Sequence, residues 1–96
     1  VRWMAPECIS QQEYSEKSDV WSFGCIVYEI FSGGNLPFED LEIFEVATQV
    51  KGGGHVKMPQ TSPKYVHQLE KMIFKVDPEK RPTFAELVTF FEGVQY

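Results

Sequence analysis

The residue types that most often hold metals or act as nucleophiles occur singly in this chain. Cys8 and Cys25 form no Cys-x-x-Cys pair, and His55 and His67 are isolated from one another. A zinc site needs three or four such ligands brought together. The sequence therefore predicts no metal site and no cofactor held by this chain itself.

The three consecutive glycines at residues 52–54 do not form a phosphate-binding pattern. In phosphate-binding loops the glycines precede a helix and lead into a Lys-Ser/Thr pair, so that backbone N–H groups surround the phosphate. Here the glycines follow a helical pattern, and no Lys-Ser/Thr pair comes after them. We interpret them as the end of a helix.

Two acidic residues stand at the beginning of predicted helices. Pro6 suits the first turn of a short helix and places Glu7 near its amino end, while Asp19 opens a long apolar run. A carboxylate at this position interacts favourably with the helix dipole, by some tenths to about 1 kcal/mol when exposed. Taken alone, both residues are helix-capping acids.

Composition narrows the possible partners and compartments. The 96 residues carry a net charge of −5 without a basic run, which argues against nucleic acid or an anionic membrane as a partner. A hydrophobic fraction of 43% indicates a packed domain rather than a disordered segment. The sequence contains no apolar segment of membrane-spanning length, and its cysteine usage favours a reduced cytoplasmic setting. Because the chain begins without Met, we expect the true amino terminus to lie upstream.

Hydrophobic periodicity predicts an all-α fold with about four main helices. The first runs from Asp19, capped by Ser18, to Ser32, and its apolar residues cover nearly the whole circumference, which indicates a buried helix. The second begins near Asp40 and ends at the glycines of residues 52–54. No stretch alternates as a strand would.

Two further helices and one short helix complete the prediction. Ser62 and Pro63 open the third main helix as N-cap and first residue, and the Asp-Pro pair at residues 77–78 ends it. Thr83 and Glu86 form a capping box that opens the fourth. The short helix follows the Ala-Pro-Glu sequence at residues 5–7.

Three motifs resemble the last third of a protein kinase catalytic domain, in the form typical of receptor-type tyrosine kinases. They read Val-Arg-Trp-Met-Ala-Pro-Glu at residues 1–7, Lys-Ser-Asp-Val-Trp-Ser-Phe-Gly at residues 17–24 and Asp-Pro-Glu-Lys-Arg-Pro-Thr-Phe at residues 77–84. The resemblance implies that residues 1–96 are part of a kinase domain: the substrate loop, a buried central helix and the final helices of the C-lobe. Two departures, Ile-Phe at residues 73–74 and the turn at residues 35–40, weaken a finer subfamily assignment.

The resemblance also implies roles for individual residues. In kinases the glutamate of Ala-Pro-Glu pairs with an arginine, which stands at Arg81 here, and arginine can grip a carboxylate through two hydrogen bonds. In kinases, the aspartate that corresponds to Asp19 accepts hydrogen bonds from the backbone of the catalytic loop. That loop is not in this chain, so we expect the Asp19 carboxylate to be solvated or unsatisfied. Trp21 and Gly24 are expected to serve packing.

The resemblance assigns substrate binding to the first four residues: Val1, Arg2, Trp3 and Met4. In kinases this loop receives the peptide residue that follows the phosphorylated one. Trp3 and Met4 are also explained simply as apolar residues near a core.

The implied function is that of the C-terminal portion of a protein tyrosine kinase, which acts on tyrosine in proteins or peptides. The chain has no Gly-rich loop, catalytic-loop Asp and Asn, or Asp-Phe-Gly motif, so it contains no catalytic residue and is predicted to be inactive alone. The resemblance implies that the whole kinase domain binds ATP and Mg²⁺. The rest of that domain is an expected partner of this chain. We expect the chain to be cytoplasmic, also if the whole protein is a membrane-anchored receptor. Alternatives are a pseudokinase that acts as a binding module and docks partners through an apolar patch around Leu41, Ile43 and Phe44, a tyrosine-kinase-like serine/threonine kinase, and an autonomous helical interaction domain without a kinase parent.

Overall fold

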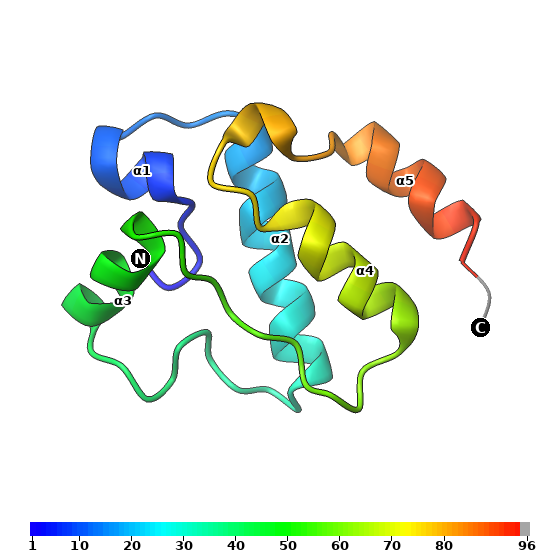
Figure 1. Ribbon diagram of the computed structural model, residues 1–96, viewed down its shortest axis with the longest axis horizontal. Coiled ribbons are helices and arrows are strands. Elements are labelled where there is room, and N and C mark those ends of the chain that lie inside the picture. The colour runs from blue at the N-terminus through cyan, green and yellow to red at the C-terminus, as the bar shows by residue number, and fades with distance from the viewer. Residues whose placement is uncertain (95–96) are drawn as a thin grey trace.

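The computed structural model describes residues 1–94, and its described part consists of helices and loops without a strand. The predicted all-α fold is therefore confirmed, including the short helix after Ala5. The elements are α1 (Pro6–Gln11), α2 (Glu16–Phe31), α3 (Ile43–Lys51), α4 (Lys64–Ile73), the short 3-10 helix η1 (Pro78–Lys80) and α5 (Phe84–Glu92). In Figure 1, α2 stands in the middle, with α1 and α3 on one side and α4 and α5 on the other.

Helix α2 begins at Glu16 rather than Asp19, because Ser15 is its cap and Ser18 is not. The Ser15 hydroxyl accepts a hydrogen bond from the backbone N–H of Lys17, and the Ser18 hydroxyl accepts one from the backbone N–H of Ser15, each 3.1 Å long. This reciprocal arrangement is a capping box in which serine takes the place of the usual glutamate.

Helix α4 differs from its prediction at both ends. Pro63 occupies the cap position, and the hydroxyl of Ser62 is buried without a hydrogen-bond partner among the described residues. The helix ends at Ile73 instead of continuing to the Asp-Pro pair, because the following residues turn their carbonyls toward Arg81. The tertiary contact therefore overrides a helical pattern that continues to Val76.

Helices α3 and α5 follow capping chemistry. Helix α3, the second predicted main helix, begins at Ile43 rather than near Asp40. At this end the Glu45 carboxylate accepts a hydrogen bond from the backbone N–H of Glu42. The predicted box at the start of α5 is present: the Thr83 hydroxyl accepts from the Glu86 N–H at 3.0 Å, and the Glu86 carboxylate accepts from the Thr83 N–H at 2.9 Å.

The core is built around α2, which packs against α4 and η1, while α1 packs against α3. Phe23 joins α5 to α2 through edge-to-face contacts with Phe84 and Phe91. The expectation that α2 is buried all round is wrong for one side, where Ile26 and Ile30 are exposed. No other described element covers these two side chains.

Replacing Gly24 by alanine tests how closely α2 and α4 approach. An alanine Cβ would lie 2.8 Å from the Ile73 Cγ2 and 2.9 Å from the Phe74 Cζ, inside van der Waals contact. We expect the free energy of unfolding to fall by about 1–3 kcal/mol, although alanine favours a helix. Urea denaturation measures the change. Gly93→Ala is the matched control, because its Cβ would meet no atom closer than 3.6 Å, and an equal loss in both variants would contradict the explanation.

Candidate functional site

Glu7 and Arg81, 74 residues apart in the sequence, meet in the interior. The Arg81 Nη1 donates to the Glu7 Oε2 and its Nη2 to the Glu7 Oε1, both at 2.8 Å. Both residues are buried, with Arg81 only 2% and Glu7 8% exposed. We call this two-bond ion pair the Glu7–Arg81 clamp. It is the fork-to-fork geometry in which arginine binds a carboxylate most strongly.

The remaining N–H groups of Arg81 hold three backbone carbonyls. Its Nε donates to the Lys75 oxygen at 2.8 Å, its Nη1 to the Lys17 oxygen at 3.0 Å and its Nη2 to the Val76 oxygen at 3.3 Å. The guanidinium also lies over the Trp21 ring, 5.0 Å from its centroid. All five N–H donors of Arg81 are therefore used. One side chain joins α1, α2 and the segment between α4 and η1.

The clamp determines the ionisation of Glu7. Burial raises the pKa of this carboxyl and is the largest single effect, but the hydrogen bonds from Arg81, the Glu7 backbone and the Ser18 hydroxyl, with the Arg81 charge, outweigh it. The Ser18 Oγ donates to the Glu7 Oε2 at 2.8 Å. The net pKa of Glu7 lies below its ordinary value, so the carboxylate is ionised at neutral pH.

The first four residues form a segment that is held from two sides. The Arg2 guanidinium donates to the carbonyls of Pro37, Phe38 and Leu41 at 3.0, 2.6 and 2.9 Å. This loop precedes α3 and needs an anchor, because Phe38 adopts a left-handed φ of 53°. Arg2 therefore fixes the segment to the loop.

The other side of this segment is fixed to α2. The Trp3 indole N–H donates to the Glu29 carboxylate, and the Ser22 hydroxyl donates to the Trp3 carbonyl at 2.7 Å. A turn closed by the Met4 N–H and the Val1 carbonyl at 3.0 Å leaves Val1 exposed. The segment is thus an ordered surface feature, bound at both Arg2 and Trp3.

The other predicted site residues take separate positions. Asp19 is exposed, and in the part of the chain that the structure describes its carboxylate makes no hydrogen bond. Trp21 and Gly24 lie in the core, where Trp21 meets Phe74 edge to face at 5.0 Å between ring centroids and Gly24 lies against Ile73. The structure therefore brings Glu7 and Arg81 together but leaves Asp19 apart from them.

Sequence reasoning missed three residues that support this arrangement. The Lys17 Nζ donates to the Arg81 carbonyl at 2.8 Å, so Arg81 is held through its backbone as well as through its side chain. Ser18 and Glu29 bind Glu7 and Trp3 as described above. Ser18 stands three residues after Ser15, which is a recognisable capping spacing, but nothing local to Lys17 or Glu29 marks their long-range partners.

Residues 1–94 contain neither a candidate metal site nor a candidate membrane-spanning helix. No group of three or more His, Cys, Asp and Glu side chains is placed to hold a metal ion there. Over the same residues, no helix combines the length and apolarity that a membrane crossing requires.

Comparison with known proteins places this site in context. The model of the family described as protein tyrosine and serine/threonine kinase matches residues 1–91. The chain is 40% identical to the tyrosine-protein kinase receptor ver-3 of Caenorhabditis elegans over 93 residues, which cover 97% of this chain and 8% of that protein. It is 41% identical to the mouse tyrosine-protein kinase Srms over 87 residues, covering 91% and 18%. It is 38% identical to the mouse protein-tyrosine kinase 6 over 93 residues, covering 97% and 21%. The chain thus spans about a fifth or less of these relatives.

Proposed function

Because this chain belongs to the protein tyrosine and serine/threonine kinase family, we propose that residues 1–96 form the C-terminal, substrate-side part of a protein tyrosine kinase domain. The parent domain transfers the γ-phosphate of ATP to tyrosine in proteins. The relatives, which are named as tyrosine kinases, support this acceptor. The observation that carries the proposal is the ordered segment of residues 1–4, bound to α2 and to the loop before α3.

In this proposal the first four residues recognise the peptide. Arg2 and Trp3 act as positioning residues, because their polar groups bind the protein itself and leave the surface of the segment for substrate. Val1 is exposed and Met4 is half-buried, so both contribute apolar surface to that segment. Pre-organisation of this kind reduces the entropy lost when a peptide binds.

The rest of the kinase domain is the proposed partner of α2. Asp19, Ile26 and Ile30 are exposed and spaced by seven and four residues along this helix, so they lie on one side of it. An aspartate without a hydrogen bond beside apolar residues suits a surface covered by backbone N–H groups and other apolar side chains. We assign Asp19 to holding a backbone loop from outside this chain. In this proposal ATP and Mg²⁺ are also bound by residues outside this chain, and the domain works in the cytoplasm. Neither nucleic acid nor a membrane is a proposed partner.

A phosphotransfer assay on two proteins tests this proposal. The 96-residue chain alone is expected to transfer no phosphate, because phosphoryl transfer needs positioned metal ions and a base. The longer product of the natural transcript is expected to phosphorylate a tyrosine peptide but not its serine counterpart. Arg2→Gln in that product should raise KM for the peptide while leaving KM for ATP unchanged, since it frees the loop at residues 37–41.

Each alternative gives a different result in this assay. Phosphorylation of serine or threonine would favour a tyrosine-kinase-like serine/threonine kinase over a tyrosine kinase. ATP-dependent labelling by the 96-residue chain would contradict its predicted inactivity. A longer product that transfers phosphate to neither peptide would favour a pseudokinase.

One surface feature favours an interaction module as the second candidate. At the start of α3, Ile43 is 47% and Phe44 is 72% exposed, whereas Val46 and Val50 on the other face are buried. Leu41 is half-buried beside them. Exposed apolar side chains of this size suit protein docking. Phe44→Ser should then abolish capture of a partner without changing phosphotransfer by the longer product.

A further inference from the structure

Two adjoining hollows on one face collect much of the positive charge of the chain. A hollow of about 480 Å³ is lined by Lys17, Lys71, Lys75 and Lys80, among others. A second hollow of about 330 Å³ is lined by Lys57 together with the same Lys71 and Lys75. We call these five lysines the basic face. They are five of the nine Lys and Arg residues in a chain whose net charge is −5.

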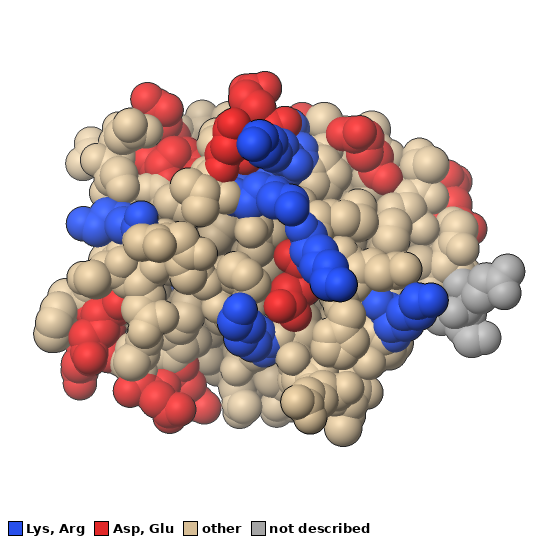
Figure 2. Space-filling model, in the orientation of Figure 1, with Lys and Arg blue, Asp and Glu red and all other residues tan. Residues whose placement is uncertain are grey.

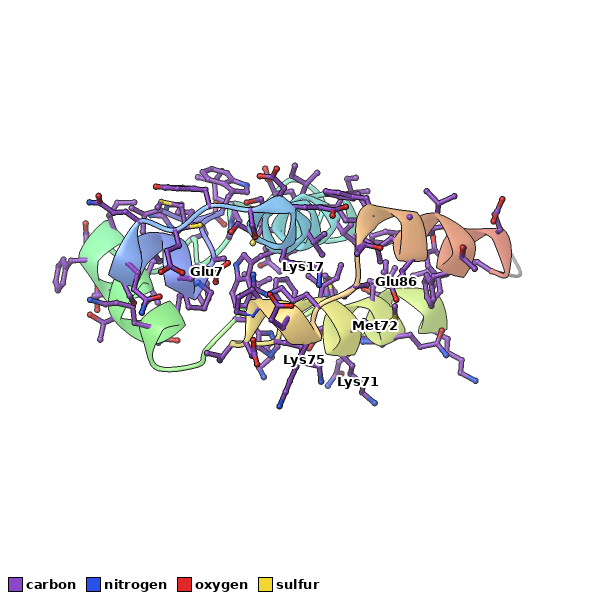
Figure 3. All side chains as sticks on the ribbon, turned by 90° about the horizontal axis from the view of Figure 1, so that it is seen from above. Glu7, Lys17, Lys71, Met72, Lys75 and Glu86 are labelled. Carbon is purple, nitrogen blue, oxygen red and sulfur yellow. The ribbon has the colours of Figure 1, made fainter. Side chains whose placement is uncertain are left out.

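The figures show how this face is arranged. Figure 2 shows basic side chains in a row across the middle of one face, whereas most acidic side chains lie toward its edges. In Figure 3, Lys71 on α4 and Lys75 in the segment after it extend away from α2. Their ammonium groups are therefore open to a ligand from solvent.

The ammonium groups of this face lack acidic partners of their own. Among residues 1–94 the ion pair of Glu7 and Arg81 is the one within 4.0 Å, so none of the five lysines is paired. The Lys17 ammonium donates to backbone carbonyls, and the ammonium groups of the other four lysines make no hydrogen bond in this part of the chain. Like charges held together without partners repel each other, and a bound anion would relieve that repulsion.

Three carboxylates line the same two hollows, and two of them accept hydrogen bonds from backbone N–H groups. Glu70 accepts a hydrogen bond from the Met58 backbone N–H at 2.9 Å. Glu86 accepts one from the Thr83 backbone N–H, and this bond is the leading cause that holds its pKa below the ordinary value. Glu79, which also lines the larger hollow, makes no ion pair within the described residues. Three carboxylates therefore face five ammonium groups across the two hollows, which leaves this face with a net positive charge.

We propose that the basic face binds a phosphorylated segment of a protein partner, with the phosphate between Lys71, Lys75 and Lys80. These lysines come from α4, from the segment after it and from η1, so they approach one hollow from different elements. A phosphate dianion has several acceptor oxygens and suits lysine point charges better than a single carboxylate does. A flat anionic membrane fits less well, because the lysines surround a hollow that is also lined by Glu79 and Glu86.

Fluorescence anisotropy with a labelled phosphoserine peptide and its unphosphorylated counterpart tests this proposal on the purified protein. A serine peptide keeps the result independent of tyrosine phosphorylation. We expect the phosphopeptide to bind more tightly, and Lys71→Gln/Lys75→Gln to weaken its binding by about tenfold, as the loss of two exposed ionic contacts would. The matched control, Lys51→Gln/Lys64→Gln, removes the same charge outside the two hollows and should change the affinity by less than about twofold.

Several outcomes would overturn the proposal. Equal weakening in both double variants would mean that net charge alone attracts the peptide. Equal affinity for the two peptides would exclude recognition of phosphate. Binding to phosphatidylserine vesicles that depends on Lys71 and Lys75, without phosphopeptide binding, would make this face a membrane contact instead. Circular dichroism of each variant confirms that the fold is intact.

Discussion

Replacing Arg81 by methionine is expected to lower the free energy of unfolding by about 3–5 kcal/mol, the cost of leaving a buried charge without its partner. Methionine fills much of the same space but has no N–H group. The Glu7 carboxylate would lose two hydrogen bonds, and the carbonyls of Lys17, Lys75 and Val76 would lose their donor. Urea denaturation followed by far-UV circular dichroism measures the loss.

Matched variants separate the clamp from a general charge effect. Lys80→Met removes an exposed cation next to Arg81 and should change stability by no more than about 0.5 kcal/mol. Arg81→Lys keeps the charge but has three donors in place of five, so its loss should be intermediate. A double-mutant cycle with Glu7→Gln isolates the pair, and a coupling energy near zero would contradict the clamp.

The pH dependence of stability provides a second readout of the same clamp. The pKa of Glu7 in the folded protein lies below its ordinary value of 4.5. The clamp therefore contributes its full stability above that ordinary value, and this contribution is lost as the pH falls through the lowered pKa. In Glu7→Gln this part of the acid-induced decline should be absent. An unchanged decline would show that other carboxyls cause it.

Replacing Trp21 by alanine is expected to lower the free energy of unfolding by about 3–5 kcal/mol, as is typical for a large aromatic residue in a core. Trp21 is 2% exposed, packs edge to face on Phe74 and carries the Arg81 guanidinium over its ring. Removal leaves a cavity beside the clamp and takes away these contacts. Urea denaturation measures this change as well.

Tyr14 provides the control for this second variant. It is 69% exposed in the loop between α1 and α2, so Tyr14→Ala should change stability by no more than about 0.5 kcal/mol. Trp21→Phe keeps a ring and should lose less than Trp21→Ala. If Trp21→Ala cost no more than Tyr14→Ala, the core would not depend on this indole.

Local signals accounted for the existence of the helices and for some of their ends. The Thr83 and Glu86 capping box predicted the start of α5, and Pro6 predicted the short helix α1. These signals act over three or four residues, so they are visible in the sequence itself. Where a predicted cap was wrong, at Ser18 and Ser62, two serines or a serine and a proline competed for one cap position. The geometry of the backbone decided between them.

The helical composition, the kinase-family motifs and the residue types suited to a clamp can be predicted from the sequence, because they depend on local spacing and side-chain chemistry. The meeting points of distant groups depend on the packed fold: Arg81 uses all five donors, Arg2 holds the loop before α3, and lysines from α2, α4 and η1 surround one hollow. Such contacts join residues far apart in the chain, and no local pattern records which of many acids, carbonyls or cations will become neighbours once the core has packed.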